Sequence, residues 1–452
     1  MSYTVFFASL GCDKNLVDTE KMMALLPSPE FVLTEDESEA DVIVVNTCAF
    51  ILDAKQESIE TIIELAQMKE NGRCKVLIAA GCLAQRYQSE LKEEIPEVDA
   101  LVGTTAFDSL ADVIRNAIKG MTDPKEDDIA PESNVFKPLD HLPKDLTERV
   151  RTGFSPYRYL KIAEGCNKRC TYCAIPDMRG PYRSVPMEEL IAEAELLAQD
   201  GATELILVAQ ETTLYGVDIY GEKKLPELLH KLCKIDGIEW IRLMYCYPEE
   251  ITKELIEAMK SEPKVCHYLD IPIQHSDDDV LKKMGRRTNQ KELIEKIEMI
   301  RGILPDIAIR TTLISGFPGE TIAQHKACID FVKRMRFDRL GVFPYSEEEN
   351  TPAAGFDDQI DPEERIRRAD EIMKVSEGVI FDKNKELIGR KMQVIVEGYL
   401  PEDGCYIGRS YRDAPEIDGL VFFESEIERL TSETVWVNIT EANGYDLKGD
   451  IV

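Results

Sequence analysis

Cys166, Cys170 and Cys173 form a CxxxCxxC motif in the middle of the chain. Cysteines spaced by three and then two residues can wrap one tight loop around a cubane iron–sulfur cluster, which contains four irons. Three thiolate ligands leave one iron without a protein ligand, so a small molecule can bind there. The motif therefore predicts a catalytic cluster rather than one that only transfers electrons. Zinc sites usually pair CxxC motifs and use four ligands, so this spacing fits zinc poorly.

Three other cysteines each follow an apolar run that is typical of a buried strand. The runs are residues 5–10, 42–45 and 76–80, and the cysteines are Cys12, Cys48 and Cys82. Helical patterns follow, as at 16–26 and 54–68, which indicates βα units of a parallel sheet. The carboxyl ends of such strands share one edge, so the three cysteines should converge. Gly11 and Gly81 precede two of them and would let the backbone approach a bulky inorganic ligand, so we predict a second three-cysteine cluster.

The central part of the chain alternates strand-like and helical segments. The predicted strands are 159–163, 205–209, 240–245, 268–273, 307–314 and 340–343. Six βα repeats suggest an open partial (β/α)6 TIM-like barrel with its active site at the carboxyl ends of the strands. The polar residues expected there are Cys166, Gln210, Glu211, Tyr247, Gln274, His275, Ser315 and Tyr345. A lone histidine such as His275 is more often a hydrogen-bonded loop residue than a catalyst.

The domain boundaries follow from changes in this periodicity. An α/β domain is predicted for 1–120, a linker for 121–151, the barrel domain for 152–382 and a small β domain for 383–452. A polar helix over 362–387 leads into the last of these. Its strand-like segments, 391–398, 405–410, 419–423 and 434–439, predict a five-stranded OB-like barrel.

Charge and composition narrow the possible partners. The 452 residues carry a formal net charge of −31, and residues 383–452 contain eight Lys and Arg against fourteen Asp and Glu. A nucleic-acid-binding surface needs clustered basic residues to displace counterions, so this charge argues against nucleic acid as the primary partner. An acidic barrel suits a basic partner instead. No run approaches ~18 apolar residues, which predicts a cytoplasmic protein without a membrane span. The six remaining cysteines show no ligand spacing.

Over essentially its full length the chain resembles the radical S-adenosylmethionine (SAM) methylthiotransferases. The resemblance rests on the two cysteine sets, on the terminal barrel, and on three stretches: SLGCDKNLVD at 9–18, AKQES at 54–58 and IPDMRG at 175–180. These stretches are similar to the branch of the family that modifies an aspartate of small-subunit ribosomal protein S-twelve. The resemblance implies a methylthiotransferase N-terminal domain, a radical SAM domain and a C-terminal TRAM domain.

The resemblance also implies two 4Fe–4S clusters and SAM as cofactors. Cys166, Cys170 and Cys173 would hold the cluster whose open iron binds SAM, and the N-terminal cysteines would hold the cluster that supplies sulfur. The residues expected to contact SAM are Tyr172, Gln210, Gln274, Arg310 and Ser315. The product would be a methylthio group on the β-carbon of the aspartate. A low-potential electron donor such as a flavodoxin or ferredoxin is implied as well.

Two alternatives remain at the level of sequence. A tRNA methylthiotransferase acting on an adenosine next to the anticodon shares the cysteines, but it usually carries a more basic terminal barrel. An iron–sulfur electron-transfer protein is the alternative of another class. Such carriers generally use four cysteines per cluster, whereas both sets here have three.

Overall fold

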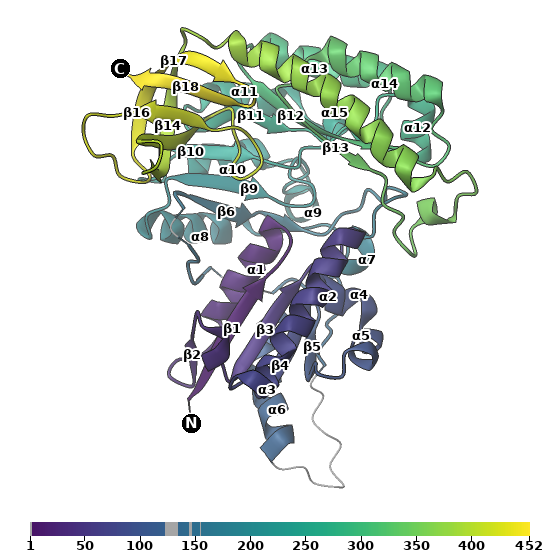
Figure 1. The fold of residues 1–452 in the computed structure, drawn as a ribbon, viewed down its shortest axis with the longest axis vertical. Coiled ribbons are helices and arrows are strands. Elements are labelled where there is room, and N and C mark those ends of the chain that lie inside the picture. Colours follow the sequence, from purple (N-terminus) through teal and green to yellow (C-terminus); the bar gives the residue numbers. More distant parts are fainter. Residues whose placement is uncertain (1, 123–133, 144–146, 154) are drawn as a thin grey trace. The chain divides into compact units, whose positions relative to one another are not determined.

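The computed structural model describes residues 2–122, 134–143, 147–153 and 155–452, which form two compact units (Figure 1). The first unit comprises Met1–Gly153, Glu164–Arg169 and Cys173–Val185. The second comprises Phe154–Ala163, Cys170–Tyr172 and Pro186–Val452. The chain of the CxxxCxxC motif thus contributes residues to both units.

The first unit is built on a five-stranded parallel sheet with the order β2-β1-β3-β4-β5. The strands are β1 (Tyr3–Ser9), β2 (Phe31–Leu33), β3 (Val42–Thr47), β4 (Val76–Gly81) and β5 (Ala100–Val102). Every residue of β3 and β4 is buried, as expected for central strands of a parallel sheet with both faces covered. The predicted parallel α/β domain is confirmed, and the short strands β2 and β5 extend it beyond the strands that the sequence indicated.

Helices cover both faces of this sheet. They are α1 (Asp13–Ala24), α2 (Leu52–Ala66), α3 (Met68–Asn71), α4 (Cys82–Tyr87), α5 (Ser89–Glu94), α6 (Leu110–Thr122) and α7 (Ile175–Arg179), with 3-10 turns η1 (Glu37–Glu39) and η2 (Phe107–Ser109). One core cluster includes Ile62 of α2 and Met178 of α7. The other, from the alternate residues of the strands, includes Met22 of α1 and Ile114 of α6. This alternation follows from the two-residue period of a strand.

The predicted linker 121–151 lies partly outside the described residues. Its described portion packs onto the sheet of the first unit. Val135 forms a β-bridge with Val102, the last residue of β5, and Phe136 packs against the core. The guanidinium of Arg149 forms an ion pair with Glu20 of α1. These residues therefore add to the N-terminal unit.

The second unit contains an open six-stranded sheet in which every neighbouring pair is parallel. Its order is β13-β12-β11-β10-β9-β6, so successive βα repeats lie side by side. The strands are β6 (Tyr157–Lys161), β9 (Glu204–Val208), β10 (Trp240–Leu243), β11 (Val265–Asp270), β12 (Ala308–Ser315) and β13 (Arg339–Pro344). The six predicted strands all exist, with ends displaced by a few residues.

The connections of this sheet are mostly helical. They are α8 (Met187–Gln199), α9 (Val217–Tyr220), α10 (Leu225–Leu232), α11 (Lys253–Ser261), α12 (Asp278–Lys283), α13 (Gln290–Ile303), α14 (Ile322–Met335) and α15 (Pro362–Lys385), with 3-10 turns η3 (Pro248–Glu250) and η4 (Pro352–Gly355). The two-residue strands β7 (Ala163–Glu164) and β8 (Arg183–Ser184) pair with each other. In the described part of the chain, no helix has the length and apolar character needed to cross a membrane.

The chain ends in a closed five-stranded barrel with the order β14-β15-β16-β18-β17. Its strands are β14 (Lys391–Leu400), β15 (Cys405–Ser410), β16 (Val421–Glu424), β17 (Thr434–Asn443) and β18 (Asp446–Ile451). The predicted OB-like barrel is confirmed. The fifth strand, β18, is mostly polar and lacked a strand signal in the sequence.

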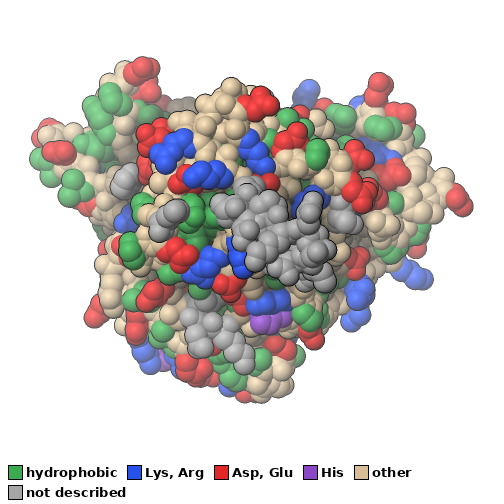
Figure 2. Space-filling model, turned by 90° about the horizontal axis from the view of Figure 1, so that it is seen from below, with side chains coloured by type: hydrophobic (Ala, Val, Ile, Leu, Met, Phe, Trp, Pro, Cys, Tyr) green, Lys and Arg blue, Asp and Glu red, His purple; other side chains and the backbone are tan. Residues whose placement is uncertain are grey.

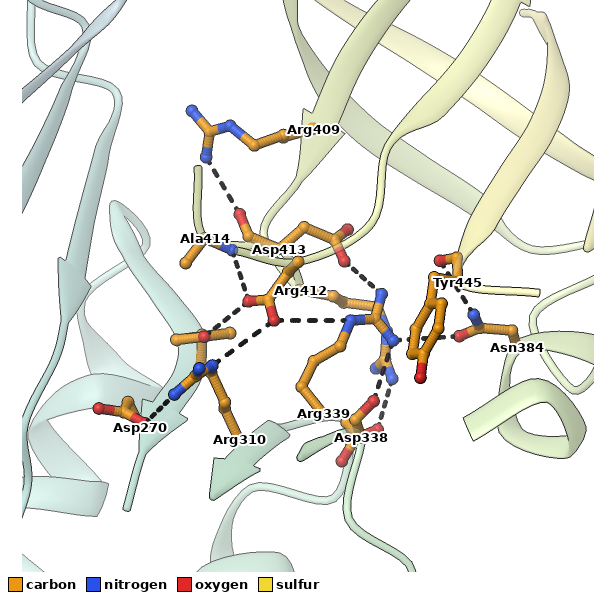
Figure 3. A network of polar contacts seen from close by, with 12 residues as sticks. Asp270, Arg310, Asp338, Arg339, Asn384, Arg409, Arg412, Asp413, Ala414 and Tyr445 are labelled. Atoms are coloured by element: carbon orange, nitrogen blue, oxygen red, sulfur yellow. Dashed lines mark hydrogen bonds and ion pairs between the residues drawn. The ribbon is translucent and has the colours of Figure 1, made fainter. Parts of the chain in front are cut away.

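A buried network of charges joins this barrel to the six-stranded sheet (Figure 3). Arg339 at the start of β13 pairs with Asp413 beyond β15. Arg310 of β12 donates to Asp270 at 2.9 Å and lies 3.7 Å from Asp418, which follows β15. These contacts lie toward the amino ends of β12 and β13, so the carboxyl ends remain available for a functional site.

Candidate functional site

The three N-terminal cysteines follow neighbouring strands at one edge of the first sheet. Cys12 is the N-cap residue of α1 after β1, Cys48 directly follows β3, and Cys82 begins α4 directly after β4. Because β3 pairs with both β1 and β4 in parallel, these strand ends are adjacent. The predicted convergence of the strand ends that carry these cysteines is therefore present in the fold.

Gly11 and Gly81 leave room at this edge in a way that other residues would not. Gly11 has φ +82°, and a Cβ there would lie 2.8 Å from Sγ of Cys48. Gly81 has φ +88°, and a Cβ there would lie 2.3 Å from Oδ1 of Asn46. Both positions thus need glycine for backbone conformation and for space. The two glycines therefore let the loops that carry Cys12, Cys48 and Cys82 pack closely against one another.

Asn15 of α1 ties two of the cysteine-bearing loops together. Its side-chain amide donates to the carbonyls of Leu10 at 2.8 Å and Thr47 at 3.0 Å, so it connects the residues before Cys12 and Cys48. Cys48 is held further by Ser58 of α2, whose hydroxyl accepts from the backbone N–H of Cys48 at 3.0 Å. The edge is consequently ordered by side chains that are not themselves candidate ligands.

Arg179 of α7 reaches the same edge. Its Nε donates to Sγ of Cys82 at 3.3 Å, and its Nη1 donates to Asp18 at 2.7 Å and to Glu164 at 3.1 Å. Its Nη2 donates to Oδ1 of Asn15. Arg179 lies inside the IPDMRG stretch but was not among the predicted site residues.

The protonation of these thiols reflects their surroundings. Burial raises the pKa of the Cys82 thiol to about 12, Arg179 opposes the rise, and Cys48 and Cys12 add to it. Burial, followed by the charge of Cys12, also raises the pKa of Cys48. Among the described residues, no three His, Cys, Asp or Glu side chains already surround a single metal ion; a cubane carries its thiolates on separate irons and needs a wider spacing.

The CxxxCxxC loop is positioned by backbone and side-chain contacts, some in each unit. In the first unit, the N–H of Cys166 donates to the carbonyl of Gly180 at 3.1 Å. In the second unit, Sγ of Cys170 lies 3.8 Å from the Tyr247 hydroxyl. The neighbouring Thr171 donates its backbone N–H to the carbonyl of Met284 at 3.0 Å. Cys173 is partly buried.

Arg286 is a second buried arginine that the sequence analysis did not identify. Its guanidinium lies 4.3 Å from the centre of the Tyr247 ring, a cation–π contact, and it is 5% exposed. Its Nε and Nη1 have no hydrogen-bond partner among the described residues. Buried donors of this kind normally have a partner, so they suit an anionic group bound near Cys170.

Two of the residues expected to contact SAM carry buried, unsatisfied oxygens. Within the described residues, neither Oε1 of Gln274 nor Oγ of Ser315 has a hydrogen-bond partner. Gln274 follows β11 with φ +69° and exchanges backbone hydrogen bonds with Thr312 and Ile314 of β12. Ser315 ends β12. The fold thus brings these two residues together at the carboxyl edge of the sheet.

The other predicted SAM contacts are placed differently. Tyr172 packs edge-to-face against Phe317, with ring centres 6.4 Å apart, beside the turn that follows Ser315. Gln210 lies two residues beyond β9. Arg310 lies five residues before Ser315 on β12 and pairs with Asp270 and Asp418. Five residues of strand span about 17 Å, so Arg310 is far from the other candidates, and its role in SAM binding stays a prediction.

The turn after β12 is stabilised by a buried carboxylate. Glu320 accepts from the backbone N–H of Gly316 and lies 3.5 Å from Nε2 of His275. Burial would raise the pKa of Glu320, but interactions with His275 and His325 outweigh it and hold the pKa at about 2. His275 thus serves as a structural partner of Glu320, as its sequence context suggested.

Comparisons with known proteins agree with this architecture. The model of "Uncharacterized protein family UPF0004" matches residues 4–103, that of the radical SAM superfamily matches 160–332, and that of the TRAM domain matches 388–452. Among solved structures, the radical SAM methyltransferase TsrM from Kitasatospora setae has a TM-score of 0.58 at 16% identity, covering 78% of this chain and 77% of that one. This likeness shows the fold alone.

The fold and the CxxxCxxC loop define a radical SAM enzyme with an additional N-terminal domain and a TRAM domain. "Ribosomal protein uS12 methylthiotransferase RimO" of Lachnoclostridium phytofermentans is 56% identical over 98% of this chain and 99% of that protein. The proteins of the same name from Acetivibrio thermocellus and Clostridioides difficile are 47% and 46% identical, over 100% and 98% of this chain and 99% and 98% of theirs. The chain belongs to the RimO family of radical SAM methylthiotransferases.

Proposed function

We propose that this enzyme inserts a methylthio group at the β-carbon of an aspartate in ribosomal protein uS12, acting in the cytoplasm. The observation that carries the proposal is the presence of two separate three-cysteine sets. One set follows three adjacent parallel strands, and the other lies in one short loop. The names of the relatives, which match along the whole chain, support uS12 as the substrate.

Each cysteine set suits a 4Fe–4S cluster with one open iron. Cys166, Cys170 and Cys173 would hold the first cluster, and the unpartnered donors of Arg286 are suited to an anionic group beside Cys170. Cys12, Cys48 and Cys82 would hold the second, on loops that Gly11 and Gly81 allow to pack closely together. When bound, these groups and SAM supply radical chemistry and a sulfur source that no side chain provides.

The residues of this chain would position SAM rather than react with it. The unsatisfied oxygens of Gln274 and Ser315 can accept hydrogen bonds from its ribose or ammonium groups. Tyr172 offers an aromatic face near the turn that Glu320 stabilises. Gln210, beyond the carboxyl end of β9, is a further candidate.

The terminal barrel is suited to a basic protein partner. The segment between β16 and β17 exposes Glu426 and Glu428 together with two large apolar side chains, Ile427 at 61% and Leu430 at 70% exposure. Acidic side chains also lie elsewhere on the molecule: the view from below in Figure 2 shows them spread over that face, with Lys and Arg among them. Acidic and apolar groups side by side complement a basic polypeptide better than a phosphate backbone. A flavodoxin or ferredoxin is proposed as the electron donor.

An anaerobic competition assay tests the proposal. Reconstituted enzyme, SAM, sulfide and a strong reductant would be incubated with uS12 and a tRNA anticodon stem-loop together, and mass spectrometry would identify which molecule gains a methylthio group. Modification of an aspartate in uS12 is expected. Modification of the RNA would instead identify a tRNA methylthiotransferase, and a protein that binds clusters without cleaving SAM would be an electron carrier.

Cysteine variants separate the two clusters in the same assay. Cys12→Ala, Cys48→Ala or Cys82→Ala should keep SAM cleavage and abolish methylthio transfer. Cys170→Ala should abolish both. A methylthio product from any of the N-terminal variants would refute the role given to the second cluster.

A further inference from the structure

Arg179 places a fully buried cation against one of the candidate cluster ligands. It is 3% exposed, and its Nε–H points at Sγ of Cys82 from 3.3 Å. Asp18 and Glu164 accept hydrogen bonds from Nη1 at 2.7 and 3.1 Å, and Oδ1 of Asn15 accepts from Nη2. Three oxygen acceptors therefore fix the orientation of the guanidinium, and its Nε–H donates to the sulfur of Cys82.

This arrangement exceeds what packing of α7 requires. The helix is already held by Met178 in the core and by the carbonyl of Met178, which accepts from the Thr104 hydroxyl at 2.6 Å. A buried guanidinium is costly unless its donors are satisfied, and a neutral thiol is a weak acceptor. A thiolate bound to iron is a much better acceptor, because it keeps its negative charge. The contact is thus best matched to the metal-bound form of Cys82.

Hydrogen bonds to ligand sulfurs and nearby positive charge are the means by which proteins tune iron–sulfur clusters. Both stabilise the more negative, reduced form of a cluster and raise its reduction potential. Asn15 adds a second connection, because the side chain that accepts from Arg179 also donates to the carbonyl before Gly11 and to the carbonyl of Thr47 before Cys48. The position of Arg179 is therefore coupled to the loops of all three N-terminal cysteines.

We propose that Arg179 is a positioning residue that holds the Cys82 thiolate in place and raises the reduction potential of the N-terminal cluster. The inference rests on the proposed function, because it requires that Cys12, Cys48 and Cys82 bind a cluster. It also connects the N-terminal cysteines with Cys166 and Cys173, the two cysteines of the CxxxCxxC motif that belong to the first unit. Arg179 lies six residues after Cys173, and Gly180, the next residue, accepts the backbone N–H of Cys166. The segment that follows the CxxxCxxC motif thereby supplies the cation that contacts Cys82.

The test uses the full-length chain with Cys166, Cys170 and Cys173 changed to Ala, so that the N-terminal cysteines alone can bind iron. Arg179→Gln removes the charge, and Arg179→Lys keeps it. Arg149→Gln is the matched control, because Arg149 is also a buried arginine paired with a carboxylate of α1, Glu20, in the same unit. Iron and sulfide per chain, and the midpoint potential from EPR-monitored redox titration, would be measured for each.

We expect Arg179→Gln to lower the midpoint potential by at least 59 mV, which is a tenfold change in the ratio of reduced to oxidised cluster. Arg179→Lys should restore part of this shift, and Arg149→Gln should leave the potential unchanged. If Arg179→Gln prevents cluster binding, binding in Arg179→Lys shows that the cation is required. If both Arg179 variants lose the cluster and Arg149→Gln retains it, the planar geometry of the Arg179 guanidinium is required.

Two results would overturn the inference. Equal potentials in the parent, Arg179→Gln and Arg149→Gln would show that the charge does not act on the cluster. If all three arginine variants lost the cluster equally, Arg179 would be needed only for folding of the unit, as Arg149 is. Failure of the parent chain to bind iron would instead refute the proposed second cluster, so the two failures are distinguishable.

Discussion

Glu204 and Arg409 form a fully buried ion pair, in which Nη2 of Arg409 donates to Oε2 of Glu204 at 2.7 Å. Glu204 begins β9 and Arg409 lies in β15, so the pair joins the six-stranded sheet to the terminal barrel. The other oxygen of Glu204 accepts from Arg242 of β10, also at 2.7 Å. Burial would raise the pKa of Glu204, but Arg409 and Arg242 outweigh it and lower the pKa. The TRAM barrel is thus anchored by charges with no access to solvent.

Glu204→Ala should destabilise the second unit strongly, because it removes the carboxylate that pairs with Arg242 and leaves Arg409 with Glu397 alone. Breaking a buried pair in this way costs about 3–5 kcal/mol. Chemical denaturation of the apo protein, followed by tryptophan fluorescence, would measure the change. Glu257→Ala is the control, because the side chain of Glu257 is 57% exposed and forms an ion pair with Lys253 on the surface of α11. A change for Glu204→Ala as small as that of the control would contradict the anchoring role.

Ser315→Ala should weaken SAM binding while leaving the apo protein as stable as before, or more stable. The hydroxyl is buried and has no hydrogen-bond partner among the described residues, so its removal costs the free protein nothing. A hydrogen bond to SAM would be lost, which corresponds to roughly 2- to 12-fold weaker binding. Equilibrium binding to the reconstituted enzyme and thermal unfolding of the apo protein would be compared. Unchanged affinity would exclude a contact between Ser315 and SAM.

Gly11→Ala should prevent binding of the N-terminal cluster without affecting the CxxxCxxC cluster. A Cβ at this position would lie 2.5 Å from Cβ of Cys48, and the backbone has φ +82°, which costs a non-glycine residue roughly 1–2 kcal/mol. Iron per chain should fall by about half. Gly120→Ala serves as the control, because a Cβ at Gly120 in α6 would meet no atom within 4 Å. Full iron content in Gly11→Ala would show that the close approach of residue 11 to Cys48 is not needed for cluster binding.

The network around Glu320 should make the stability of the apo second unit depend on pH in both directions. The pKa of Glu320 falls from 4.5 to about 2, so its contribution is present above pH 4.5 and is lost as the pH falls toward 2. Burial lowers the pKa of His325, but Glu320 and Glu371 raise it above 6.5 overall. The contribution of His325 is therefore present below pH 6.5 and is lost as the pH rises through its raised pKa.

His325→Gln tests the alkaline side of this dependence. Nε2 of His325 lies 2.8 Å from Glu371 of α15, and its Nδ1 lies 3.7 Å from Glu320. Arg368 also faces Glu320, at 3.5 Å. Thermal unfolding of the apo protein between about pH 5 and about pH 9 should show a decline in Tm for the parent that is smaller in the variant. Parallel curves would show that His325 does not titrate in this range.

Charge reversal on the terminal barrel should weaken the interaction with uS12. Glu426→Lys combined with Glu428→Lys changes two exposed side chains between β16 and β17. A several-fold rise in KM for uS12 is expected, with kcat unchanged and with a larger effect at low salt. Glu254→Lys combined with Glu257→Lys, on the exposed face of α11, makes the same change of charge elsewhere in the same unit. An equal effect of both pairs would show that only the net charge matters.

The sequence by itself determined the two cysteine sets, the order of the three domains and most of the strands. These features are local: ligand spacing within one loop, apolar runs, and the cysteine that ends each run are all readable without knowing the contacts between elements. The strand ends of Cys12, Cys48 and Cys82 could be expected to converge because parallel strands share one carboxyl edge. The weakly apolar strand β18 was missed because its partners in the barrel, and not its own pattern, make it a strand.

Only the tertiary structure decided which side chains meet from distant parts of the chain, both around these cysteines and elsewhere. Arg179 donates to Cys82 from 97 positions away, and Glu204 pairs with Arg409 from 205 positions away. Arg310 pairs with Asp270 and Asp418, two partners that the sequence did not indicate, and its contact with SAM stays a prediction. Such contacts depend on how helices and barrels pack, because a buried charge must find its partner in space wherever that partner lies in the sequence.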